Sequence, residues 1–164
     1  MARKRQMRTD ALLDLAAEIV EEHGVSGLTM AALAEAADYA PASLYTYFPS
    51  RSALLAALQA RALVTLGEVA GSAVERWDRA LDGSDPRTAA LARLWAFHRL
   101  FLAAPEDHAR EFRLQQQLLA SPSAESLEDA ASVVPVAMSV LDVPRRLIDD
   151  AVAAGALAAD TGYG

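Results

Sequence analysis

The sequence contains no cysteine, few glycines and prolines, and no uninterrupted apolar run near the roughly 18 residues that a membrane-spanning helix requires. The lack of cysteine excludes a disulfide framework, a thiolate zinc site and a cysteine nucleophile. Aromatic residues make up only 6% of the chain, and β-branched residues are also sparse, which argues against a β-sandwich or a β-barrel. No long apolar segment follows the basic N-terminus, so we expect no signal peptide and predict a cytoplasmic protein.

The composition and length of the 164-residue chain favour a helical, globular protein. Hydrophobic residues make up 53% and charged residues 23%, which is enough apolar material for a core and excludes a disordered chain. The length fits one domain or two small packed ones, and the abundance of alanine favours helices.

The charge is distributed unevenly along the chain. The net charge is −7, yet the first nine residues contain four basic side chains and no acidic one. Such a basic arm on an acidic body can lie on DNA phosphates while the body faces away, and we expect it to be disordered until DNA arrives. The alternative is a frayed, solvated terminus. The predicted DNA-binding residues of the arm are Arg3, Lys4 and Arg5, with Arg8 beside them.

Apolar residues recur at helical spacing along the whole chain, and no strand alternation is present, which predicts an all-α protein of about eight helices. Thr9, Thr29 and Ser50 are predicted N-caps. Pro105 is expected to open a helix, and Pro135 to kink or end one. The predicted helices cover residues 9–22, 30–37, 42–48, 51 to about 77, 87–103, 106–119, a segment after 123, and 145–154, the last opened by Pro144.

The first three predicted helices suit a helix-turn-helix unit, in which the second helix of a closely spaced pair enters the major groove of DNA. Leu44 and Phe48 lie on one face of the third helix and are expected to pack inward. The opposite surface carries hydroxyls and no acid, so it suits phosphate oxygens and base edges. The alternative is a plain three-helix subdomain with internal tyrosines. The outward residues are Ala42, Ser43, Tyr45 and Thr46, with Tyr47 at the rim and the charge of Arg51 nearby.

Residues 28–37 and 41–55 resemble the DNA-binding domain of the tetracycline-repressor (TetR) family, and the run Leu-Tyr-Thr-Tyr-Phe at 44–48 is highly specific. The resemblance covers about residues 8–58. It implies an all-helical, dimeric transcriptional regulator, usually a repressor, that leaves its operator DNA when a small molecule binds the C-terminal domain. It further implies phosphate contacts by Thr29, Tyr45, Tyr47 and Arg51, and positions near base edges for Pro41, Ala42, Ser43 and Thr46.

The sequence departs from the family pattern at three positions. Asp38 stands where a turn glycine is usual, and aspartate tolerates the left-handed conformation. Ala40 replaces a hydroxyl cap, which should weaken that cap by roughly 1 kcal/mol. Arg51 replaces a lysine, which keeps the charge.

The resemblance divides the chain into a DNA-binding domain at residues 1–50 and a ligand-binding and dimerisation domain at 51–164. Residues 149–157 and 160–164 resemble the lead-in to the last two helices of the family, which usually form the dimer interface. The sequence stops before them, so either the protein is short or the sequence is incomplete, and this weakens the expectation of a dimer.

Residues after about 60 match no fixed family pattern. Two consecutive helices there combine large apolar groups with a few polar ones, which is typical of a ligand pocket. A well-filled core with one hydrogen-bonded histidine is the alternative. The predicted ligand-binding residues are Trp95, His98, Phe101, Phe112 and Gln116.

No HExxH pair and no glycine-rich phosphate loop is present, so we expect no enzyme activity, cofactor or metal. The main alternative to a regulator is a helical ligand-binding or protein-interaction module that has lost DNA binding.

Overall fold

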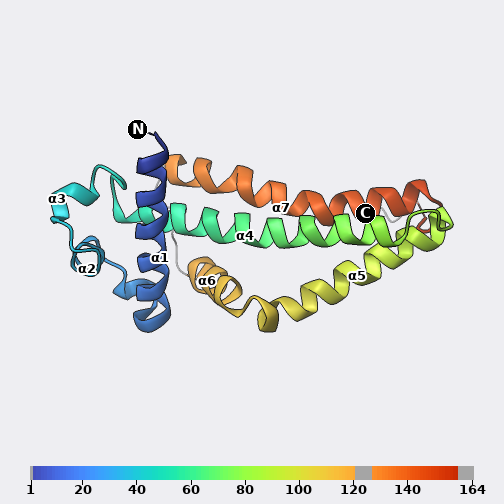
Figure 1. Ribbon diagram of the computed structural model, residues 1–164, viewed down its shortest axis with the longest axis horizontal. Coiled ribbons are helices and arrows are strands. Elements are labelled where there is room, and N and C mark those ends of the chain that lie inside the picture. The colour runs from blue at the N-terminus through green and yellow to red at the C-terminus, as the bar shows by residue number, and fades with distance from the viewer. Residues whose placement is uncertain (1, 121–126, 159–164) are drawn as a thin grey trace.

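The structure, a computed structural model, describes residues 2–120 and 127–158, and its regular secondary structure is entirely helical in these ranges. This confirms the predicted all-α class, with seven helices in the described ranges where about eight were predicted. Helices α4, α5 and α7 run along the length of the molecule (Figure 1). Helix α1 crosses one end of them, and α2 and α3 lie beyond α1. The helices are α1 (Ala2–Gly27), α2 (Met30–Ala36), α3 (Pro41–Leu44), α4 (Arg51–Ala80), α5 (Pro86–Asp107), α6 (Ala109–Ala120) and α7 (Leu127–Ala153).

Helix α1 is longer than predicted at its N-terminal end. Thr9 does not cap it; its hydroxyl lies inside the helix and donates to the carbonyl of Arg5 at 3.1 Å. The prediction of a disordered arm was therefore wrong, because residues 2–8 are helical. Most of them have good helix propensity, and Arg5 also anchors the arm by donating from Nη2 to the carbonyl of Thr46 at 2.9 Å. Gly24 kinks the helix with φ 71° and ψ 176°, a conformation open essentially only to glycine.

The turn between α2 and α3 follows the sequence-based expectations. Thr29 caps α2 by accepting from the amide of Ala32 at 3.0 Å. Asp38 adopts the predicted left-handed conformation with φ 53°, and Ala40 makes no side-chain cap for α3. Helix α3 is shorter than the predicted two turns, because it ends at Leu44. The chain then forms a series of tight turns up to residue 48.

Helix α4 is the central helix of the molecule. Ser50 caps it as predicted, accepting from the amide of Ala53 at 3.0 Å. By length and composition α4 could cross a membrane, but it packs against α1, α5, α6 and α7. It buries Leu54, Leu58 and Ala70, among others, which is typical of a core helix in a helical bundle.

Pro105 and Pro144 do not open helices as predicted, and Pro135 does not end one. Pro105 lies inside the last turn of α5, and the break before α6 comes at His108 instead. Pro135 and Pro144 both lie inside α7, so two predicted helices form one. Each proline removes one backbone donor, but α7 packs along α4 and also contacts α5, and this packing keeps the helix continuous (Figure 1).

Helix α6 shares a core with the N-terminal unit. Leu118 is only 1% exposed and, with Leu114, belongs to the same buried cluster as Leu12, Leu33 and Leu44. The Gln115 amide, also buried, donates to the carbonyl of Gln59 at 2.9 Å and ties α6 to α4. The packing therefore runs from the helix-turn-helix unit directly into the C-terminal body.

Candidate DNA-binding surface and ligand pocket

Residues 41–48, which we call the recognition segment, have the buried face and the exposed face that the sequence predicts. Leu44 and Phe48 are 0% and 3% exposed and pack into the core. Tyr45 is 53% exposed, while Tyr47 is half-buried against Tyr39 in an edge-to-face contact with centroids 6.3 Å apart. All four residues that are predicted to lie near base edges are exposed: Pro41, Ala42, Ser43 and Thr46. Thr29 is exposed too, at the start of α2.

The basic arm, residues 3–8 of α1, lies against the recognition segment. Lys4, Arg5 and Arg8 line one open hollow together with Thr46 and Tyr47. A hydrogen bond with Tyr47 raises the pKa of the Arg8 guanidinium above its usual value. The arm and the recognition segment therefore form one continuous surface that carries fixed positive charge. Arg3 is exposed at the start of the arm.

Arg51 has a structural role that the sequence did not indicate. Its Nε donates to the carbonyl of Leu28 and its Nη2 to the carbonyl of Val25, both at 2.6 Å. These bonds hold the connector between α1 and α2 against the start of α4. The guanidinium has five N–H donors, so a phosphate contact remains open to the others. No local pattern signals these contacts, because they join residues 23 and 26 positions apart.

Replacing Arg51 by alanine is expected to lower the free energy of unfolding by about 2 kcal/mol. The half-buried guanidinium makes two charge-assisted hydrogen bonds, and their loss leaves two carbonyls without these donors. Arg51→Lys should recover less than half of the loss, because an ammonium cannot form the same fork. Urea unfolding measures both variants. A change below about 0.5 kcal/mol in Arg51→Ala would show that these bonds contribute little.

An apolar pocket of about 140 Å³ lies among α4, α5, α6 and α7. Of the five predicted ligand-binding residues, Phe101 and Phe112 line it. Trp95 and His98 lie outside it on the exposed face of α5, with ring centroids 5.7 Å apart, and Gln116 is exposed on α6. The lining residues are Leu66, Val69, Ala70, Phe97, Leu100, Phe101, Ala104, His108, Phe112 and Val140.

The sequence did not identify this lining because α5 carries two apolar stripes. Phe97, Leu100 and Ala104 follow helical spacing and face the pocket. Leu91, Trp95 and Leu102 follow the same spacing on the exposed face, and Trp95 is 66% exposed. Periodicity alone does not say which stripe faces inward.

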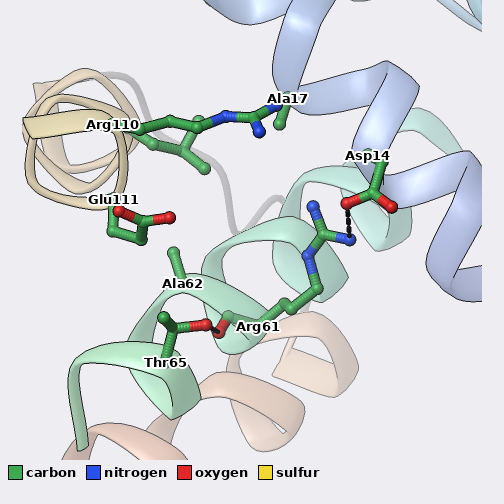
Figure 2. A pocket seen from close by; sticks show the side chains of 8 residues that line it. Asp14, Ala17, Arg61, Ala62, Thr65, Arg110 and Glu111 are labelled. Carbon is green, nitrogen blue, oxygen red and sulfur yellow. Dashed lines mark hydrogen bonds and ion pairs between the residues drawn. The ribbon is translucent and has the colours of Figure 1, made fainter. Parts of the chain in front are cut away.

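A second, polar cavity of about 210 Å³ lies where α1, α4 and α6 meet (Figure 2). Arg61 on α4 donates to the Asp14 carboxylate on α1 at 2.8 Å and to the carbonyl of Asp10 at 3.0 Å. Arg110 on α6 lies 3.3 Å from the Glu21 carboxylate of α1, measured from Nε to Oε2. Ion pairs therefore tie α1 to both α4 and α6. Within residues 2–120 and 127–158, no group of three or more His, Asp or Glu side chains is arranged to hold a metal ion.

The comparison with known families agrees with the geometry of the N-terminal unit. Residues 12–58 match the sequence model of the family described as "Bacterial regulatory proteins, tetR family". The resemblance to the TetR family is thereby confirmed. No curated protein matches the sequence.

Solved structures of transcription regulators, two of them described as TetR family, share the fold over most of the chain. A TetR family transcription regulator from Marinobacter aquaeolei is 18% identical, with a TM-score of 0.60 over 98% of this chain and 91% of its own. PfmR from Thermus thermophilus is 23% identical, with a TM-score of 0.57 over 90% and 73%. FadR from Bacillus subtilis, solved in complex with stearoyl-CoA, is 17% identical, with a TM-score of 0.54 over 92% and 74%. The chain thus has the fold of TetR-family transcription regulators.

Proposed function

We propose that the protein is a sequence-specific DNA-binding transcriptional regulator, a repressor that a small-molecule ligand releases from its operator. One observation carries the proposal: the acid-free recognition segment is exposed directly beside the helical basic arm, joined to it by the bond from Arg5 to Thr46. Hydroxyl and methyl groups that can read base edges thus lie next to charges that can bind phosphates. Because DNA is the proposed partner, the protein acts in the cytoplasm.

The residues divide into two roles in this proposal. Thr29, Tyr45, Tyr47 and Arg51, together with the arm residues Arg3, Lys4 and Arg5, contact phosphates and set the position on the duplex. Pro41, Ala42, Ser43 and Thr46 approach base edges and supply specificity. The exposure of Tyr45 and of all four base-reading residues supports this division. Residues 1–50 then act as the DNA-binding domain and the rest as the body that responds to ligand.

Helix α6 offers a route by which a ligand in the apolar pocket changes DNA binding. Phe112 faces the pocket, whereas Leu114 lies two positions further, on the opposite side of the helix, in the core shared with α1. Arg110 adds the ion pair with Glu21 of α1. A ligand that shifts α6 therefore shifts α1, and α4 provides a second connection from the recognition segment to the pocket. A coupling of roughly 1–3 kcal/mol is the usual scale of such effects.

We propose further that the regulator is a homodimer. Helix α7 exposes Val134, Met138, Leu141 and Ile148 at near-heptad spacing, and such a row of apolar side chains favours association. A two-fold dimer of helix-turn-helix units binds two half-sites about one helical turn apart.

Selection of bound duplexes from a random DNA pool, followed by gel-shift titration, tests the proposal. The expected result is an enriched inverted repeat with half-sites about 10 base pairs apart, or a multiple of that spacing, bound roughly 1,000-fold or more tightly than random DNA. Enrichment of a single, non-repeated half-site would contradict the dimer alone. No enrichment over random sequence would contradict the regulator and favour the helical module without DNA binding.

A further inference from the structure

The apolar pocket allows the class of ligand to be inferred. We propose that it binds a neutral, single-ring aromatic molecule with one hydrogen-bonding group, a phenol in the simplest case. That this ligand controls DNA binding rests on the proposed function, but the binding of the ligand itself does not depend on DNA.

The apolar space inside the pocket, which is partly open to solvent, has room for about one ring. Its volume is about 140 Å³, and a cavity of about 150 Å³ lined by Leu, Ile and Phe accommodates benzene. Val140 of α7 bounds the pocket next to α4, where a side chain at Gly67 would meet the Val140 methyl group at 3.3 Å. The absence of a side chain at Gly67 thus lets α7 approach closely and keeps the pocket narrow.

The lining selects an uncharged, aromatic ligand. Phe97 and Phe112 line the space together with Phe101, which is 61% exposed at its open side, and these rings favour edge-to-face contacts with a bound ring. No lining residue is an arginine, lysine, aspartate or glutamate, so a carboxylate or phosphate would lose its hydration without gaining an opposite charge. Stearoyl-CoA, the ligand in the FadR structure, has a long acyl chain and charged phosphates, and fits neither the volume nor the lining.

His108 supplies the polar contact. It is the one lining residue with a polar side chain, and it stands at the break between α5 and α6. Within the described parts of the chain its imidazole makes no hydrogen bond or ion pair. A neutral imidazole carries one donor and one acceptor nitrogen, so it can bond a ligand hydroxyl in either sense. The ligand hydroxyl would therefore lie at the α6 end of the pocket.

Isothermal titration of the full chain without DNA, using phenol, toluene, benzoate and stearoyl-CoA as probes, tests the inference. We expect phenol to bind most tightly, toluene about tenfold more weakly, and benzoate and stearoyl-CoA without measurable affinity. His108→Leu should lower phenol affinity about tenfold, to that of toluene, because one hydrogen bond is lost. Its toluene affinity should stay unchanged.

A matched pair of variants places the binding site. Ala104→Leu fills the pocket and should lower phenol and toluene affinity at least tenfold, whereas Ala103→Leu, one residue away and outside the lining, should not. Thermal unfolding of both variants confirms that each is folded. Equal binding of benzoate and phenol, no binding of either neutral ring, or unchanged phenol affinity in Ala104→Leu would overturn the inference. If phenol binds as expected but the random pool yields no operator, the ligand class stands and the proposed function fails.

Discussion

Replacing Lys4, Arg5 and Arg8 together by alanine is expected to weaken DNA binding on the order of 100-fold at about 0.1 M salt, roughly equally on all sequences. These three side chains line the hollow beside Thr46 and Tyr47, and the helical arm holds them there in the absence of DNA. Each phosphate contact releases condensed counterions. The slope of log K against log salt should therefore become shallower by about 3.

A control with the same change of net charge separates local contacts from the overall field. Arg76, Arg87 and Arg99 are exposed on α4 and α5, outside the N-terminal unit, and their triple alanine variant also removes three positive charges. This control should lose less than threefold in affinity and keep the original salt slope. Equal losses of DNA affinity in the two triple variants would show that the arm contributes only through the overall electrostatic field of the protein.

Leu118→Ala is expected to lower the free energy of unfolding of the whole protein by about 3 kcal/mol. The side chain is 1% exposed and packs in the cluster that α1, α2, α3 and α4 share. Truncating such a leucine loses buried apolar surface and leaves a cavity, which typically costs about 2–5 kcal/mol. Urea unfolding should stay a single transition by circular dichroism and tryptophan fluorescence, because α6 and the helix-turn-helix unit share one core.

Leu102→Ala is the matched control for Leu118→Ala. Leu102 is 62% exposed on α5, so the same truncation there should change the unfolding free energy by less than about 0.5 kcal/mol. If Leu118→Ala costs less than about 1 kcal/mol, or splits the unfolding into two transitions, then α6 is not integrated with the N-terminal unit. The proposed route from the pocket to DNA through α6 would then lose its basis.

The helix-turn-helix unit was predictable because its signals are local. The four-residue spacing of Leu44 and Phe48 fixes which face of the recognition segment is buried, and that fixes the exposed face as well. Thr29 and Ser50 cap the helices that follow them, and Asp38 takes the left-handed turn position. Each of these features depends on neighbours within four residues.

The C-terminal body was less predictable because its features depend on distant parts of the chain. Pro135 and Pro144 remain inside α7 because α7 packs along α4 and α5, which no local pattern reports. The inward stripe of α5 is chosen by the positions of α4 and α7, not by the periodicity of α5 itself. Predicted features at residues 160–164 lie outside the described residues.

Amide chemical-shift mapping of the ¹⁵N-labelled protein with the selected duplex locates the DNA-binding surface most directly. The largest changes are expected at residues 3–8 and 42–47, which form one continuous surface, with a smaller change at Thr29. The exposed face of α5 around Trp95 and His98 should change little. Changes concentrated on α5 or α7, with the arm and the recognition segment unaffected, would contradict the assignment of this surface to DNA.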